Sequence, residues 1–238
     1  MPDFIATLLL LIALELVLGV DNIVVISIIV SKLPAEARRR ARIIGLGLAL
    51  VARLIMVAGF SWVLSLTDPV LLRMSVRDLI LLGGGAFLMW KAVREIHFTV
   101  ELIEEEPVER ASPRKEMASA IAMIIVLDMV FALDSVITAV GLTDHLLTIA
   151  LAVILSFVVL LFAAGPVGEF VIQNPTFKIL ALSFLITIGI VLMLEAFHHE
   201  VPKAYIYLPM GFATFVQLLQ WRLLKNKARQ RGDEAGGI

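Results

Sequence analysis

The chain contains no cysteine, which excludes disulfides, thiolate metal sites and cysteine nucleophiles. Charged residues are also scarce, at 17% against roughly 25% in soluble proteins. Hydrophobic residues make up 60% of the 238 residues. This composition excludes a water-soluble domain. It predicts an integral membrane protein whose surroundings are a lipid bilayer, with no nucleic-acid partner.

Long apolar runs recur along the chain and are separated by short polar stretches. A membrane-spanning helix needs about 20 mostly apolar residues. The first run lacks the basic start and the cleavage site of a signal peptide, so we interpret it as a retained span. The sequence predicts an all-α polytopic membrane protein with about seven transmembrane helices. They are expected near 4–30, 43–66, 79–97, 118–142, 146–165, 177–197 and 204–224.

Lys and Arg are concentrated after the first, third and fifth predicted spans and in the C-terminal tail. Cytoplasmic loops of membrane proteins are enriched in these residues. The distribution therefore predicts a multi-pass protein with its N-terminus outside and its C-terminus in the cytoplasm. An acidic run in the third loop is interpreted as a solvated linker.

Two apolar segments repeat each other without gaps, LELVLGVDNIVVI in the first span and LDMVFALDSVITA in the fourth. The aligned polar pairs are Glu15 with Asp128, Asp21 with Asp134, and Asn22 with Ser135. The third span, GAFLMWKAVREIH, likewise resembles the sixth, GIVLMLEAFHHE, with Lys91 opposite Glu195. Because three is an odd number, the second copy enters the membrane from the opposite face, as in many secondary transporters.

This repeat divides the chain into five predicted parts. They are a first three-helix repeat at 1–97, a cytoplasmic acidic loop at 98–117, a second inverted three-helix repeat at 118–200, a seventh transmembrane helix at 201–224, and a cytoplasmic tail at 225–238.

Carboxylates inside two apolar spans need a chemical explanation, because an ionised residue at the bilayer centre costs about 2.5 kcal/mol or more. The two outer members of the repeat, Asp21 and Asp134, lie about 9 Å from the midplane acids, toward opposite faces. Carboxylate and amide oxygens suit hard cations such as Mn²⁺, Ca²⁺ and Mg²⁺. The predicted metal ligands are Glu15, Asp21, Asn22, Asp128, Asp134 and Ser135.

Four further residues are predicted as counter-ions or accessory groups: Lys91, Arg53, Glu195 and His198. Lys91 either serves as an internal counter-ion or extends to the membrane interface. Arg53 either pairs with an acid or lines a cavity. The four acids outnumber the bases within the spans, so some acids are expected to be unpaired. Two acids six residues apart do not share a helix face, so they face different cavities or the helix unwinds at Gly19.

Several motifs resemble the TerC family of integral membrane proteins: ELVLGVDNIVV, KLPAEARRRARIIGLGLAL, LLGGGAFLMWKAVREIH, LDMVFALDSV and LEAFHHEVPKAYIYLPMGFA. The resemblance covers nearly the whole chain. It implies a seven-helix protein of the bacterial inner membrane that acts in manganese homeostasis, chiefly efflux. Some members are named for tellurium resistance, and others supply manganese to exported enzymes. The family's acidic positions fall on Glu15, Asp21, Asp128 and Asp134.

The predicted function is export of divalent cations, Mn²⁺ over Ca²⁺ or Mg²⁺, as transported substrates exchanged for protons, with no tightly bound cofactor. The alternative is a metal-binding membrane partner protein in tellurium resistance or in metallation of exported proteins. An intramembrane aspartyl protease fits poorly because the Gly-x-Gly-Asp sequence is absent, and an organic-cation exporter lacks an aromatic cage. No enzymatic activity is predicted. Self-association and complexes with other membrane proteins stay open.

Overall fold

The computed structural model describes residues 2–59, 62–63, 66–67, 69–71, 74–102, 112–143, 145–199 and 201–235. Long helices form most of this part of the chain: α1 (Pro2–Ser31), α2 (Ala35–Ala58), α4 (Val76–Val100), α5 (Pro113–Leu142), α6 (Leu146–Gln173), α7 (Pro175–Ala196) and α8 (Ala204–Ala235). Two short antiparallel strands, β1 (Pro69–Leu71) and β2 (Met74–Ser75), precede α4. The predicted all-α polytopic fold is confirmed.

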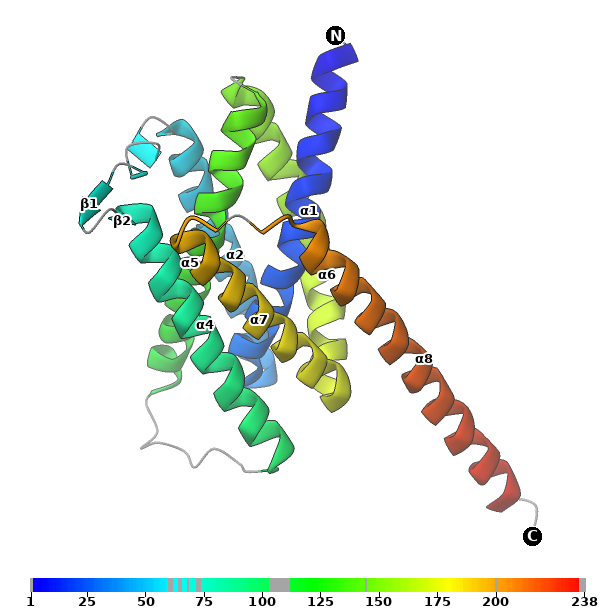
Figure 1. Cartoon of the computed structure of the whole chain (residues 1–238). Coiled ribbons are helices and arrows are strands. Elements are labelled where there is room, and N and C mark those ends of the chain that lie inside the picture. The colour runs from blue at the N-terminus through cyan, green and yellow to red at the C-terminus, as the bar shows by residue number, and fades with distance from the viewer. Residues whose placement is uncertain are drawn as a thin grey trace.

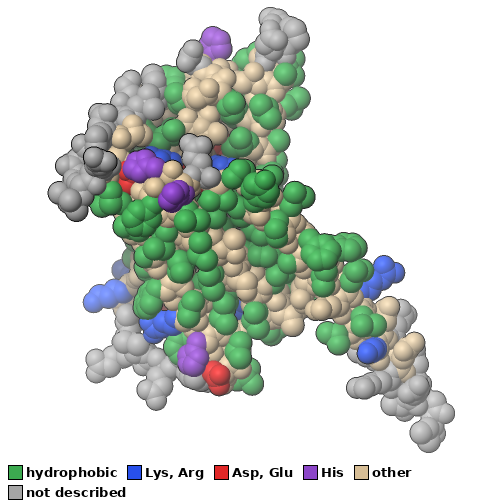
Figure 2. Space-filling model, viewed as in Figure 1, with side chains coloured by type: hydrophobic (Ala, Val, Ile, Leu, Met, Phe, Trp, Pro, Cys, Tyr) green, Lys and Arg blue, Asp and Glu red, His purple; other side chains and the backbone are tan. Residues whose placement is uncertain are grey.

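The helices present the apolar surface that a bilayer requires. Within the described residues, α1, α2, α5, α6 and α7 are each long and apolar enough to cross a membrane. Hydrophobic side chains dominate the face seen in Figure 2, and charged side chains are sparse on it. Helices α4 and α8 are as long but more polar, since α4 carries Lys91, Arg94 and Glu95 and α8 ends in a basic segment. A hydrogen-bonded helix satisfies its own backbone in lipid, which makes this arrangement stable there.

The second span differs from its prediction, because α2 covers Ala35–Ala58 and not 43–66. The arginines assigned to the loop lie in the first turns of the helix. Arg38 donates hydrogen bonds of 2.9 and 3.1 Å to the carbonyls of Leu33 and Ser31. These hydrogen bonds hold the Arg38 guanidinium at the start of α2. The helix therefore begins in the polar segment that precedes the apolar run.

The arrangement in space follows the inverted repeat (Figure 1). Helix α1 runs opposite to α5, and α4 runs opposite to α7. Helix α1 packs chiefly on α6, and the equivalent helix α5 packs chiefly on α2.

The third and sixth spans, α4 and α7, cross at aligned glycines. A Cβ atom on Gly85 would lie 2.6 Å from the carbonyl oxygen of Gly189 and 3.0 Å from Met193 Cγ. A Cβ atom on Gly189 would lie 2.8 Å from the carbonyl oxygen of Gly85 and 2.7 Å from Met89 Cγ. Gly85 aligns with Gly189 in the repeat, and Met89 aligns with Met193. These reciprocal contacts place a pseudo-twofold axis between the two helices and confirm the inverted repeat.

The interior has two apolar clusters with polar groups between them. One cluster includes Leu11 and the other includes Ile23 of the same helix. Glu15 lies in the interval between them on α1, and Arg53 occupies the equivalent interval on α2. The fold thus buries its charged centre between two hydrophobic layers.

Candidate cation site

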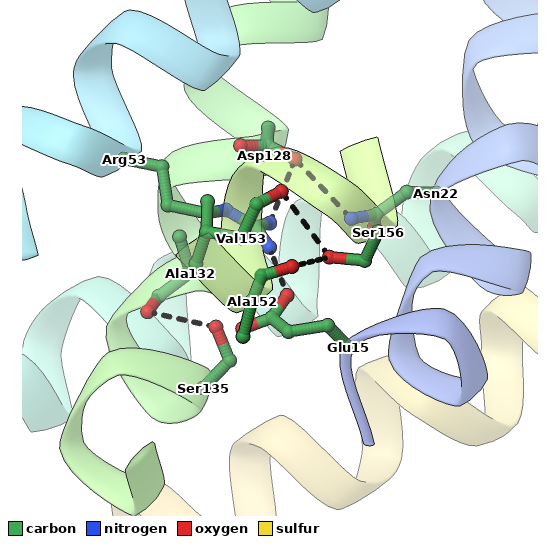
Figure 3. A network of polar contacts seen from close by, with 9 residues as sticks. All are labelled: Glu15, Asn22, Arg53, Asp128, Ala132, Ser135, Ala152, Val153 and Ser156. Carbon is green, nitrogen blue, oxygen red and sulfur yellow. Dashed lines mark hydrogen bonds and ion pairs between the residues drawn. The ribbon is translucent and has the colours of Figure 1, made fainter. Parts of the chain in front are cut away.

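A buried guanidinium group joins the two repeats at the centre of the bundle (Figure 3). Arg53 of α2 forms an ion pair with Glu15 of α1 through Nη1, and its Nη2 lies 3.0 Å from Oδ1 of Asp128 on α5. All three residues are buried. Glu15 and Asp128 are equivalent positions of the repeat and lie near the middle of their helices. Arg53 therefore neutralises charge where the two repeats meet.

Asn22 completes this centre and leaves one acceptor atom unused. Its Nδ2 donates a 3.2 Å hydrogen bond to Asp128 Oδ1. Its buried Oδ1 has no hydrogen-bond partner among the described residues. A buried acceptor without a partner costs about 1–3 kcal/mol, so this oxygen is suited to bind water or a cation.

Three neighbouring cavities lie between the centre and one end of the bundle. The vestibule, about 330 Å³, lies among α4, α5, α7 and the segment after α7. The central cavity, about 60 Å³, shares Glu195 and Lys203 with the vestibule and extends to Asn22 and Arg53. The deep cavity, about 20 Å³, shares Asn22 and Arg53 with the central cavity and reaches Asp128. Since about 10–15 Å³ holds one water, each cavity has room for water or a small ion.

Asp134 lines both the vestibule and the central cavity and is paired with two bases. It forms an ion pair with Lys203 and lies 3.3 Å from Nη2 of Arg77. The expectation that some acids are unpaired is wrong for Glu15, Asp128 and Asp134. Arg77 and Lys203 lie just outside the predicted spans, but the fold brings both of them to Asp134.

Three more of the predicted residues lie along this route. Ser135 lines the central cavity, and its hydroxyl donates a 3.3 Å hydrogen bond to a carbonyl in the preceding turn. Glu195 lines the central cavity and the vestibule. His198 lines the vestibule, with its Nε2 3.4 Å from a carboxylate oxygen of Asp78. Each of the three cavities from the vestibule to Asp128 is therefore lined by some polar groups among apolar side chains.

The other two predicted residues are Lys91 and Asp21. Lys91 on α4 lines none of the three cavities. The backbone of Asp21 lies in α1, but its side chain is outside the described residues. Unwinding at Gly19 does not occur, because α1 is a continuous helix there. Gly19 instead allows α6 to approach, since a Cβ atom on it would lie 2.3 Å from Leu160 Cδ1.

Ser156 is a site residue that the sequence reasoning missed. It lies on α6, is buried, and lines the deep cavity. Its hydroxyl donates a 2.6 Å hydrogen bond to the carbonyl of Ala152 in its own helix (Figure 3). The one signal in the sequence is a serine that interrupts the apolar run LAVILSFVV.

Ion pairs hold the opposite end of the bundle together. Glu95 of α4 is buried and accepts a 2.8 Å hydrogen bond from Lys178 of α7. Lys32, which follows α1, lies 3.4 Å from the same carboxylate. Between α2 and α6, Arg42 lies 3.4 Å from Glu169. The ion pairs of Glu95 thus link α4, α7 and the end of α1.

The charges present favour a cation as the ligand of this centre. Glu15 and Asp128 offer carboxylate oxygens, and Asn22 offers the unused amide oxygen. Among the described side chains, no three acidic or histidine residues converge as a metal-binding group. The guanidinium of Arg53 lies between the carboxylates of Glu15 and Asp128. A metal cation bound at the same position would neutralise both acids.

This fold and site define a polytopic integral membrane protein built from inverted repeats around a buried ionic centre. The sequence model of the family described as "Integral membrane protein TerC family" matches residues 1–231. The chain belongs to that family.

Several curated relatives are similar over most of the chain. The UPF0053 inner membrane protein YgdQ of Escherichia coli (strain K12) is 48% identical over 218 residues, which is 90% of each chain. A UPF0053 protein of Haemophilus influenzae is 43% identical over 227 residues, covering 93% of this chain and 95% of the relative. The UPF0053 protein YegH of Escherichia coli is 42% identical over 234 residues, but these are 44% of its length. No solved structure matches the chain.

Proposed function

We propose that this protein transports divalent metal cations across the bacterial inner membrane, with Mn²⁺ as the preferred substrate. The observation that carries the proposal is the Glu15–Arg53–Asp128 centre, which is buried and separated from one end of the bundle by a row of neighbouring cavities. Hard oxygen donors suit Mn²⁺, Ca²⁺ and Mg²⁺. Inverted-repeat transporters bind their substrates at such a midplane position.

Arg53 has a defined role in this proposal. Two buried carboxylates without a cation are costly in a bilayer. When the metal leaves, the guanidinium pairs with Glu15 and Asp128 and reduces the charge of the empty centre to one net negative charge. When a metal ion binds, it displaces Arg53 and takes both carboxylates together with Asn22. The empty carrier can then change conformation without carrying unpaired charge.

The direction follows from the proposed orientation. On the orientation predicted from the basic loops and tail, the end at Glu95 lies in the cytoplasm and the vestibule lies outside. The described conformation then faces outward, which is the state that releases an exported ion. Protons are the proposed counter-substrate, because a carboxylate can exchange a metal ion for a proton. Asp21, Asp134 and Ser135 are proposed as further oxygen donors along the route.

The test is Mn²⁺ flux into proteoliposomes under an imposed pH gradient, with Ca²⁺ and Mg²⁺ as competitors. We expect Glu15→Gln, Asp21→Asn and Asp128→Asn each to reduce the initial rate by at least about tenfold, because each removes a charged ligand. Glu36→Gln is the matched control, since Glu36 is an exposed acid at the start of α2. Its rate should equal that of the unaltered protein.

Two outcomes would count against the proposal. Unchanged flux in all three variants would exclude the carboxylates from the route. Metal binding by the unaltered protein without any flux would favour the alternative function, a metal-binding membrane partner protein in tellurium resistance or in metallation of exported proteins.

A further inference from the structure

A further cavity lies between α8 and the bundle, and it shares Ile188 and Tyr207 with the central cavity. It has a volume of about 420 Å³ and is lined almost entirely by apolar side chains of α1, α6, α7 and α8. Helix α8 contacts α7 and then diverges from the bundle toward the C-terminus (Figure 1). We call this cavity the α8 groove. Its wall on α8 includes Tyr207, Gly211, Thr214 and Leu218.

The helix face that lines the α8 groove continues into two basic residues. Positions 207, 211, 214 and 218 follow helical spacing, and Arg222 and Lys225 are the next positions of that face. Both basic side chains are exposed. The groove therefore has an apolar wall and a cationic end on the same face of one helix.

An aromatic contact fixes this cationic end beside the groove. The ring of Trp221 packs edge-on against Phe170 of α6, with 5.9 Å between ring centres. Phe170 itself lines the groove. The Nζ atom of Lys225 lies 5.2 Å from the centre of the Trp221 ring. The positive charge of Lys225 therefore lies beside the ring that packs on the groove wall.

We infer that the α8 groove binds an anionic phospholipid, with an acyl chain along the apolar wall and the phosphate at Arg222 and Lys225. Basic pockets between transmembrane helices bind anionic head groups in this way. A second copy of α8 fits less well, because it would bring the same two cations toward this pair. On the proposed orientation the lipid belongs to the cytoplasmic leaflet. The inference does not depend on transport of a metal.

The experiment is native mass spectrometry of the purified full chain with phosphatidylglycerol and with phosphatidylcholine of the same acyl chains. We expect tighter binding of phosphatidylglycerol, weakened about fivefold for each charge removed in Arg222→Gln and Lys225→Gln. Arg39→Gln and Arg40→Gln, two exposed basic residues on α2, are the control and should leave binding unchanged.

A second pair of variants tests the apolar wall. A Cβ atom on Gly211 or on Gly83 would have no atom within 4 Å, so both positions accept a larger side chain. Gly211→Phe fills the α8 groove and should lower binding of both lipids, whereas Gly83→Phe on α4 should not. Equal binding of the two lipids, unaffected by any variant, would overturn the proposal and indicate ordinary bilayer lipid. A dimer that dissociates in Gly211→Phe would overturn it in favour of a second copy in the groove.

Discussion

Arg53 lies between the carboxylates of Glu15 and Asp128, which occupy equivalent positions of the repeat. The guanidinium reaches both because it carries separate donor nitrogens in a fixed plane. The three charges leave one negative charge in excess in the buried centre. Breaking a buried ion pair by removing one partner is strongly destabilising, because the other charge stays buried without compensation.

The substitution Arg53→Gln should therefore destabilise the protein by about 3–5 kcal/mol. The measurement is the midpoint of thermal unfolding in detergent. Adding Glu15→Gln and Asp128→Asn to the same chain should recover most of the loss, since no buried charge is then left unpaired. Arg40→Gln, at an exposed position, should change stability by no more than about 0.5 kcal/mol.

The same variant distinguishes a structural arginine from one that stands in for a metal ion. If the two carboxylates form the metal site, millimolar Mn²⁺ should raise the midpoint of Arg53→Gln more than that of the unaltered protein, because the site is no longer occupied by a guanidinium. An equal response of both proteins to Mn²⁺ would contradict the proposed role.

The repeat supplied a second copy of the signal for three of the predicted metal ligands, and their role as ligands stays a prediction. Glu15, Asn22 and Asp128 were predicted from one alignment, and the fold brings them together. The partners of Asp134 were not predicted. Arg77 and Lys203 lie 57 and 69 residues from it in the chain, and no motif connects them. Such pairings depend on tertiary packing, which spacing along one helix does not reveal.

At the scale of elements, helix α4 is positioned by a close backbone approach to α7. Gly83 and Gly85 are neighbours in one GGG sequence but have different surroundings. A Cβ atom on Gly85 would lie 2.6 Å from a backbone oxygen of α7, whereas one on Gly83 would meet nothing within 4 Å. Small residues allow helices to pack closely, but the GGG sequence alone does not show which glycine makes the contact.

The substitution Gly85→Ala should destabilise the protein by about 1–3 kcal/mol, because the added methyl group forces α4 and α7 apart. Gly83→Ala is the matched control and should be neutral or stabilising by up to about 1 kcal/mol, since alanine favours the helix. Thermal unfolding of both variants in the same detergent makes the comparison. Equal midpoints for the two variants would refute the role assigned to this crossing.

At the scale of the whole molecule, the two ends of the bundle are equivalent by the repeat but differ in structure. The vestibule at one end is lined by Thr138 and Glu195. Their equivalents at the other end are Val25 and Lys91, and Val25 is buried, with 4% of its surface exposed. Glu95 and its two lysine partners lie at this closed end. A transporter with inverted repeats would open this end by exchanging the conformations of its two halves.

This exchange can be followed by thiol labelling, because the chain has no cysteine of its own. In otherwise unaltered protein in liposomes, Thr138→Cys should react rapidly with a polar maleimide, and Val25→Cys slowly. Glu95→Gln removes the negative charge that pairs α4 with Lys178 and Lys32, so it should favour the state open at that end. If the ion pairs contribute about 1 kcal/mol, the labelling rate of Val25→Cys should rise about fivefold.

The control is Glu36→Gln, which removes an exposed acid on α2 with no tie to α4 and should leave the labelling rate of Val25→Cys unchanged. An inverse change at Thr138→Cys in the Glu95→Gln protein would show that one end closes as the other opens. Faster labelling at both positions would instead indicate general loosening of the bundle. Equal labelling rates of Thr138→Cys and Val25→Cys, with Glu95 unaltered, would contradict an opening at one end of the bundle. That result would also contradict the alternating access on which the proposed export depends.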